Sequence, residues 1–367
     1  MDNPYFSIIV PMYNAERYIK ICIDSILNQT FQDFEIIIVD DASTDNSVTL
    51  CRELYGNNKK VHLFCNEKNH GTPSFGRNYG FENSFGKYIW FIDNDDLIIP
   101  TALEKIYNAT KVERGGVDVI HCLGRYRTSQ DNANPIEVSK LTLKWDDRAE
   151  GFLDEDVVLR LTDNWVKKRI WIATWINIYN RDFLVKHNMR FLDCLVEDMP
   201  ISFEALCYAK KYLMFRDAIY IWRQRSNSLS NKTDFNRFKL YVKSFMEISN
   251  FMAEVMEKIP ALKNNRILKE QSALQIVDYI FPHRTVPFYN GAHISAELDN
   301  AVYEAMLPTF GENTTMAKYF FHGFNAMYQQ ANILSQQMRL LQKRETVYQK
   351  QEKLIEQLKK LLDQYER

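Results

Sequence analysis

Short apolar runs alternate with amphipathic stretches along the first third of the chain. Each run has the length of a buried strand and ends in polar or turn-forming residues. Between the first two runs, one apolar helical face within Ala15–Gln29 is formed by Ile19, Cys22, Ile23 and Ile26. Strands that alternate with helices predict an α/β fold with a mostly parallel sheet. The expected strands are Phe6–Val10, Phe34–Val39, Val61–Cys65, Tyr88–Ile92 and Val117–Cys122.

The pattern changes to long helical stretches after about residue 233. We therefore expect two domains, residues 1–232 and an all-helical region of residues 233–367. Between residues 327 and 362 an apolar side chain recurs every seven positions, while the companion heptad position is mixed. Two interpretations stay open for this segment, a helix docked on its own domain and a homo-oligomer interface. The apolar heptad residues are Met327, Leu334, Leu341, Tyr348, Ile355 and Leu362.

Composition narrows the classes of partner. The chain has 367 residues, with 46 Lys+Arg against 47 Asp+Glu, so no basic field favours nucleic acid. The 6 cysteines lack CxxC spacing, which favours buried thiols in a reducing compartment. No apolar run approaches the ~20 residues that span a bilayer, and the start lacks a basic signal-peptide region. We expect a cytoplasmic protein; peripheral association with the inner face of the plasma membrane stays open.

Acidic residues follow the strand expected at Tyr88–Ile92. Asp93, Asp95 and Asp96 place three carboxylates within four positions, with Asn94 between them. Such groups repel one another unless a cation or solvent compensates, and strand ends are where α/β sheets bind ligands. Oxygen ligands suit Mg2+ or Mn2+. The alternative is an acidic turn that caps the next helix.

A second strand also runs into acidic and hydroxyl residues. Asp40 and Asp41 end the strand, and Ser43 and Asp45 follow within the next four positions. A carboxylate here can accept the N3–H of uracil or the ribose hydroxyls. Ser43 and Asp45 are more typical of a helix cap. Beyond the first strand, Tyr13 offers a ring that can stack beside a base.

Five motifs in this order resemble those of family 2 inverting glycosyltransferases of the bacterial surface-polysaccharide type, which have the GT-A fold. The resemblance covers about residues 5–230 and leaves the last third unexplained. Departures are minor, since Ala42 stands where glycine is frequent and Asn94 where serine is frequent. The motifs are Val10–Asn14, Asp40–Asp45, Asn69–Gly71 with Gly76–Asn78, Gly86–Asp96, and Glu197–Asp198.

The resemblance implies a site for a nucleotide-sugar donor, with UDP as the favoured nucleotide. Asp41 would contact the base, and Arg77 would approach the diphosphate. Asp93 would face the ribose or sugar, and Asp95 would coordinate Mn2+ or Mg2+ held by the diphosphate. The other residues implied around the donor are Pro11, Tyr13, Asn14, Glu16, Asp40, Asn69, Gly71 and Asn94.

An inverting transfer also needs a base on the sugar face opposite the leaving group. The resemblance assigns this base to Asp198, with Glu197 as an orienting or acceptor-binding group. The alternative for this acidic pair is the N-terminal cap of a helix. Upstream, Trp175 would shape the acceptor side, either stacked on a sugar or packed in the core.

Arginine and hydroxyl side chains follow a strand-like run near residue 220. Arg223, Arg225 and Ser228 are natural phosphate ligands. The family often carries such a segment, which closes over the diphosphate. A solvated surface loop is the alternative for each of the three.

The sequence thus predicts a hexosyl- or N-acetylhexosaminyltransferase that moves a sugar from a UDP-linked donor to a hydroxyl of a glycan, lipid-linked or polymer acceptor. No GxGxxG follows the first strand, which argues against a dinucleotide oxidoreductase. A phosphoacceptor receiver domain is excluded because Asp40 and Asp198 lie too far apart. A catalytically silent carbohydrate-binding or scaffold protein is the remaining alternative, against which the intact Asp95 and Asp198 argue.

Overall fold

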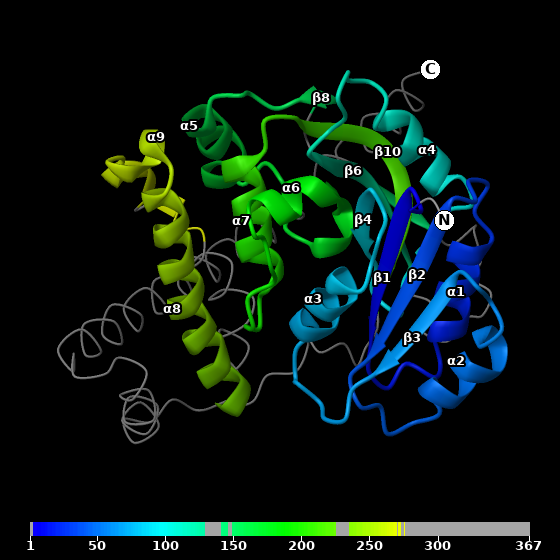
Figure 1. Ribbon diagram of the computed structural model, residues 1–367. Coiled ribbons are helices and arrows are strands. Elements are labelled where there is room, and N and C mark those ends of the chain that lie inside the picture. Colours follow the sequence, from blue (N-terminus) through cyan, green and yellow to red (C-terminus); the bar gives the residue numbers. More distant parts are fainter. Residues whose placement is uncertain are drawn as a thin grey trace, which may run out of the picture. The chain divides into compact units, whose positions relative to one another are not determined.

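The computed structural model describes residues 3–128, 141–145, 149–224, 235–269, 271–272 and 275. All of them belong to one compact unit, Met1–Phe288 (Figure 1). Arg225, Ser228 and the heptad positions between residues 327 and 362 lie outside the described residues. The structure therefore does not test the predictions for these residues.

The described strands form one sheet in the order β3-β2-β1-β4-β9-β6-β10-β5, with β7 paired to β6 and β8 paired to β10. The strands are β1 Phe6–Met12, β2 Phe34–Asp40, β3 Val61–Cys65, β4 Tyr88–Phe91, β5 Leu97–Ile98, β6 Val119–Thr128, β7 Thr142–Trp145, β8 Gly151–Phe152, β9 Asn177–Asn180 and β10 Tyr212–Arg223.

The first half of the sheet is parallel. Strands β3, β2, β1 and β4 all run in one direction, and β6 and β10 are parallel to each other. Strand β9 lies antiparallel between β4 and β6 and joins these two parallel groups. The predicted α/β fold with a mostly parallel sheet is confirmed. Strand β9 is an antiparallel strand within this sheet, and its sequence does not predict this direction.

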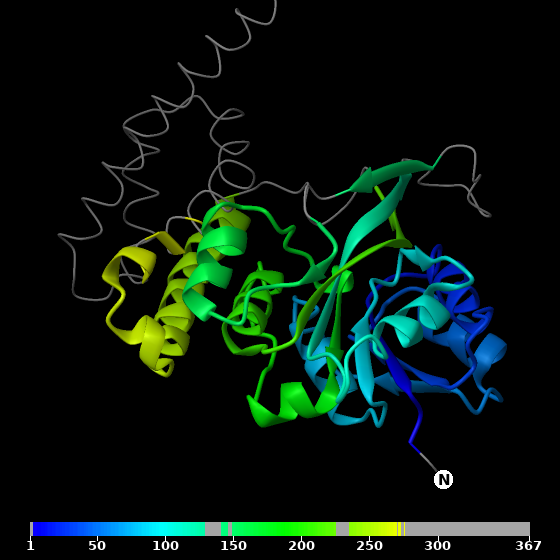
Figure 2. The same ribbon diagram turned by 90° about the horizontal axis from the view of Figure 1, so that it is seen from above.

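The helices cover both faces of the sheet (Figures 1 and 2). Alternate residues of β1 point to opposite sides, so Ile8 and Val10 pack in one apolar cluster and Ile9 packs in the other. The first cluster includes residues of α1, α2 and α4, and the second includes residues of α3, α7 and α8. The helices are α1 Ile19–Leu27, α2 Ser47–Tyr55, α3 Ser74–Glu82, α4 Ala102–Ala109, α5 Val157–Arg160, η2 Leu161–Val166, η3 Thr174–Ile176, α6 Arg181–Lys186, α7 Asp198–Tyr208, α8 Phe235–Glu257 and α9 Pro260–Lys263.

Helix α8 begins just after the domain boundary that the sequence suggests. Its Ile248 and Met252 are buried in the same cluster as Phe203 of α7, so this part of the helical region packs against the sheet domain. The boundary at residue 233 stays a prediction. No helix among the described residues combines the length and hydrophobicity that crossing a bilayer requires.

The cysteines are free thiols. Five of them are buried and Cys65 is exposed, so the expectation of buried thiols holds for all but one.

Candidate active site

The carboxyl ends of β1, β2 and β4 meet at one edge of the sheet. The register of β1 against β2 pairs Met12 with Asp40, and the backbone N–H of Asp41 donates to the carbonyl of Met12 at 2.8 Å. From the loop after β4, the Asn94 side chain donates to the carbonyl of Pro11 at 2.8 Å. The loops that carry the predicted donor residues are therefore tied to one another by hydrogen bonds.

Asp41 is buried and held from several directions. Its carboxylate accepts from the Asn66 amide at 3.1 Å, from the His70 backbone N–H at 2.8 Å, and contacts His70 Nδ1 at 2.6 Å. Asn69 donates to the Asp41 carbonyl, and Gly71 turns the chain with φ 81°. Asn66 lies outside the motifs that the sequence analysis identified, and His70 lies inside the Asn69–Gly71 motif but was given no role there.

The neighbouring Asp40 is almost fully buried. Its Oδ2 accepts from the backbone N–H of Ser43 at 3.0 Å, whereas Oδ1 has no hydrogen-bond partner among the described residues. Ala42 adopts φ 60°, in the left-handed region, which explains why glycine is frequent at this position in the family.

The loop after β1 faces the loop after β2. Asn14 accepts from the backbone N–H of Thr44 at 2.8 Å, and Glu16 accepts from that of Asn46 at 3.0 Å. Asp45 accepts from the backbone N–H of Ser47 in the first turn of α2, although Asn46 and not Asp45 is the N-cap residue of this helix. Tyr13, with 45 % of its surface exposed, remains available to a ligand.

The acidic loop after β4 is anchored by β10. Buried Asp96 accepts from the Tyr220 hydroxyl at 2.7 Å and from the Arg223 backbone N–H at 2.7 Å. Arg223 Nε donates to the carbonyl of Asp95 at 3.0 Å. Burial, together with Asp95 and Asp93, raises the pKa of Asp96 well above its ordinary value.

This acidic turn does not cap a helix. Strand β5 follows it, and helix α4 begins only at Ala102, where Thr101 makes no side-chain capping bond. The capping alternative for the acidic loop is therefore wrong.

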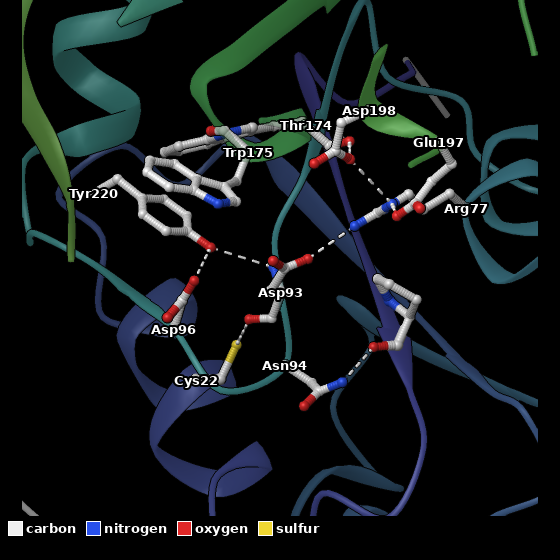
Figure 3. A network of polar contacts seen from close by, with 12 residues as sticks. Cys22, Arg77, Asp93, Asn94, Asp96, Thr174, Trp175, Glu197, Asp198 and Tyr220 are labelled. Carbon is white, nitrogen blue, oxygen red and sulfur yellow. Dashed lines mark hydrogen bonds and ion pairs between the residues drawn. The ribbon is translucent and has the colours of Figure 1, made fainter. Parts of the chain in front are cut away.

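Arg77 lies at the centre of the site (Figure 3). Its guanidinium donates to Asp93 at 2.9 Å and to Glu197 at 2.6 Å, and it lies 3.6 Å from Asp198. Burial by itself lowers the pKa of Arg77, but the three carboxylates raise it above its ordinary value. The expectation that Arg77 approaches a diphosphate stays a prediction, since its two terminal nitrogens are engaged by the protein's own carboxylates.

Close packing of α3 places Arg77. A Cβ on Gly80 would come within 2.5 Å of Ile9, and one on Gly76 within 3.1 Å of Pro11. The missing side chains let α3 approach β1, which brings Arg77 over the strand ends. Asn78 exchanges hydrogen bonds of 2.9 Å with the backbone of Phe191, so the same helix also holds the segment that leads to Glu197.

Glu197 and Asp198 stand at the start of α7. Glu197 makes no capping bond, because its side chain pairs with Arg77 instead. Burial and the adjacent Asp198 raise the pKa of Glu197 to about 7, although Arg77 acts in the opposite direction. Asp198 accepts a hydrogen bond from the Thr174 hydroxyl, and burial raises its pKa above the ordinary value.

Trp175 takes the core role that the sequence left open. Only 5 % of it is exposed, and its ring stacks on Tyr220 with centroids 4.2 Å apart. Its carbonyl accepts from Trp90 Nε1 at 2.7 Å. Trp175 therefore supports Tyr220, whose hydroxyl holds Asp96 (Figure 3). A stacking contact with an acceptor sugar stays a prediction.

The residues present fit a divalent cation that is shared with a ligand. Among the residues that the structure describes, no group of three or more His, Cys, Asp and Glu side chains is arranged to hold a metal. Mg2+ and Mn2+ sites in nucleotide-dependent enzymes commonly use one or two carboxylates, with phosphate oxygens and water as the other ligands. The carboxylate of Asp95, in the loop after β4, matches that donor set, whereas Asp93 is paired with Arg77.

The family model and the similar proteins all describe glycosyltransferases. The sequence model of "Glycosyl transferase family 2" matches residues 7–169. EpsJ of Bacillus subtilis, described as an uncharacterized glycosyltransferase, is 29 % identical over 233 residues, which are 62 % of this chain and 63 % of EpsJ. YibD of Escherichia coli, described in the same way, is 31 % identical over 228 residues, 61 % of this chain and 62 % of YibD. The chain thus spans less than two thirds of either relative.

Solved structures show the same fold. Staphylococcus aureus TarS, residues 1–349 in complex with UDP-GlcNAc, superposes with a TM-score of 0.61 at 19 % identity. The superposition covers 88 % of this chain and 87 % of that one. Together with the sheet order and the motifs at its edge, these comparisons support a family 2 glycosyltransferase domain over residues 7–169, and the solved structures show a GT-A-like fold.

Proposed function

We propose that the chain is a metal-dependent inverting glycosyltransferase that moves a hexosyl or N-acetylhexosaminyl group from a UDP-linked donor to a hydroxyl of a glycan, lipid-linked or polymer acceptor. The observation that carries the proposal is one buried guanidinium, Arg77, in contact with Asp93 on one side and near Asp198 on the other. An inverting transfer needs a base on the face of the sugar opposite the leaving group, and Asp198 is the carboxylate proposed for this role.

The environment of Asp41 supports uridine as the nucleoside. An ionised carboxylate offers about four acceptor positions, and Asn66 and His70 occupy three of them. One position is left for a donor on the base. Uracil presents a single N3–H, whereas guanine presents both N1–H and an amino group. TarS, which has the same fold, is known in complex with UDP and with UDP-GlcNAc.

The acidic loop supports the metal requirement. Asp95 would hold Mn2+ or Mg2+ together with diphosphate oxygens, and the cation would offset the charge that builds on the leaving UDP. The chain itself fixes this loop, since Tyr220 and Arg223 hold Asp96 from β10. Asp198, held by Thr174, would take the proton of the acceptor hydroxyl.

Calorimetric titration of UDP and GDP, each with Mn2+ and with EDTA, tests the donor site. We expect UDP to bind more tightly than GDP, and only with the metal. A panel of UDP-sugars with and without candidate acceptors then tests turnover. Metal-dependent UDP binding without turnover of any donor would favour the catalytically silent alternative, and equal binding of GDP would contradict the assignment of Asp41.

A further inference from the structure

The side-chain hydroxyl of Thr174 donates a hydrogen bond to the carboxylate of Asp198. Thr174 lies in the short helix η3, directly before β9, and only 1 % of it is exposed. Its Oγ1 donates to Asp198 Oδ1, the same oxygen that lies 3.6 Å from Arg77 (Figure 3). One oxygen of this carboxylate therefore accepts a hydrogen bond from Thr174 and forms an ion pair with Arg77, which belongs to a different element.

The frame around Thr174 is rigid. Strand β9 pairs with β4 and with β6 immediately after it, so η3 is attached to the middle of the sheet. The next residue, Trp175, is fixed through its carbonyl by Trp90 and through its ring by Tyr220. A hydroxyl held in this way can orient a carboxylate without moving itself.

We propose that Thr174 is a positioning residue for the transfer reaction: it fixes Asp198 Oδ1, so that Oδ2 is presented to the acceptor hydroxyl as the proton acceptor. This inference rests on the proposed function, because it assigns the base to Asp198. In the step itself, Asp198 Oδ2 takes the proton of the acceptor hydroxyl, the acceptor oxygen bonds to the anomeric carbon, and the bond to the diphosphate breaks with both electrons leaving on UDP.

The electrostatics of Asp198 agree with such a role. Burial raises the pKa of Asp198, and Asp93 acts in the same direction. Arg77 and Thr174 both lower it and so favour the ionised form that acts as a base. The other titratable groups around it are the adjacent Glu197 and buried Tyr179 of β9.

Replacement of Thr174 by valine keeps the shape and removes the hydroxyl. We expect the NMR titration midpoint of Asp198 in 13C-carboxyl-labelled protein to move to higher pH by roughly one unit. The signal is assigned by its loss in Asp198→Asn. Thr174→Ser, which retains the hydroxyl, should restore the wild-type midpoint, and Thr174→Ala serves as a second variant if valine disturbs folding. An unchanged midpoint in both variants that lack the hydroxyl would overturn the proposal.

Kinetics provide an independent readout. We expect Thr174→Val to lower kcat by up to ~100-fold near neutral pH, with the acid limb of the profile moved to higher pH and KM for the donor unchanged. Thr30→Val is the matched control, because the Thr30 hydroxyl donates to the carboxylate of Glu104 on the surface. A loss of donor affinity with an unchanged pH profile would mean that Thr174 is only structural. A wild type that turns over no donor would refute the proposed function. The NMR titration of Asp198 would even then show whether the Thr174 hydroxyl lowers the pKa of this carboxylate.

Discussion

Arg77 and Glu197 form a 2.6 Å ion pair although 120 positions separate them in the sequence. The pair connects helix α3 to the start of α7, and through Asp93 the same guanidinium reaches the acidic loop after β4. The buried guanidinium of Arg77 thus connects the loop proposed to bind the sugar donor with the helix start that carries the proposed base. Disturbing it should therefore affect both regions together.

Replacement of Arg77 by lysine keeps the charge but cannot make the forked contact with Asp93 and Glu197. We expect a loss of roughly 1–3 kcal/mol in the free energy of unfolding, because buried carboxylates lose hydrogen bonds, and a large fall in turnover. Chemical denaturation and a transfer assay measure the two effects. Arg190→Lys is the control, since Arg190 pairs with Glu82 at 3.5 Å near the surface. Equal behaviour of the two variants would contradict a central role for Arg77.

Tyr220→Phe should loosen the acidic loop. The variant removes a 2.7 Å hydrogen bond to buried Asp96, so we expect a destabilisation of about 1–3 kcal/mol and weaker metal-dependent UDP binding. Tyr55→Phe is a matched control, because the Tyr55 hydroxyl donates to the carboxylate of Asp24 at 2.8 Å, outside the site. Thermal unfolding and calorimetry separate the outcomes. If both variants leave UDP affinity intact, Tyr220 has no part in shaping the donor site.

Asp95→Asn should abolish most of the metal dependence of UDP binding. It removes one anionic ligand while nearly preserving the size of the side chain, so the free energy of unfolding should change little. Calorimetric titration of UDP with Mn2+ and with EDTA provides the measurement. Asp182→Asn, at an exposed position of α6, is the control. Unchanged metal-dependent affinity in Asp95→Asn would remove this residue from the metal site.

Asp198→Asn should lower turnover by ~100 to ~10,000-fold while UDP affinity survives, since the amide cannot accept the proton. The proposed base acts only in its ionised form. Because burial raises the pKa of this group, activity should fall on acidification at a pH above the ~4 of an ordinary aspartate. A pH profile of kcat measures this. Near-normal turnover in the variant would make Glu197 the next candidate base.

Glu204 supplies a prediction about stability. It is buried on α7, and burial raises its pKa to about 8, although Lys258 acts in the opposite direction. The folded state then binds a proton that the unfolded state has lost between about pH 4.5 and pH 8. Stability therefore falls as the pH rises through this window.

Glu204→Gln removes the titration and should be more stable than the wild type at pH 8 by roughly 1–4 kcal/mol, with little difference at pH 5. Denaturation curves at both pH values provide the test. Glu254→Gln, at an exposed position of α8, is the control for the loss of a surface charge. A constant difference between Glu204→Gln and the wild type would contradict the raised pKa.

The pattern of residues along the chain was sufficient to predict the strands of the parallel half, the α/β class and the acidic residues at the strand ends. These features are local. A strand reveals itself by a short apolar run and a helix by its 3.6-residue period, so β3 has the predicted bounds Val61–Cys65 and the apolar face of α1 lies where its pattern predicts. The order of motifs along the chain was enough to indicate the family.

The contacts between these residues, in contrast, become visible only in the folded domain. Tyr220 meets Asp96 across 124 positions, and Thr174 meets Asp198 across 24, with no periodicity that connects either pair. Strand β9 likewise lies antiparallel between β4 and β6, a pairing that its four residues alone cannot indicate. Contacts between distant segments depend on sheet order and on close packing such as that of Gly80 on Ile9, and these arise only when the whole domain has folded.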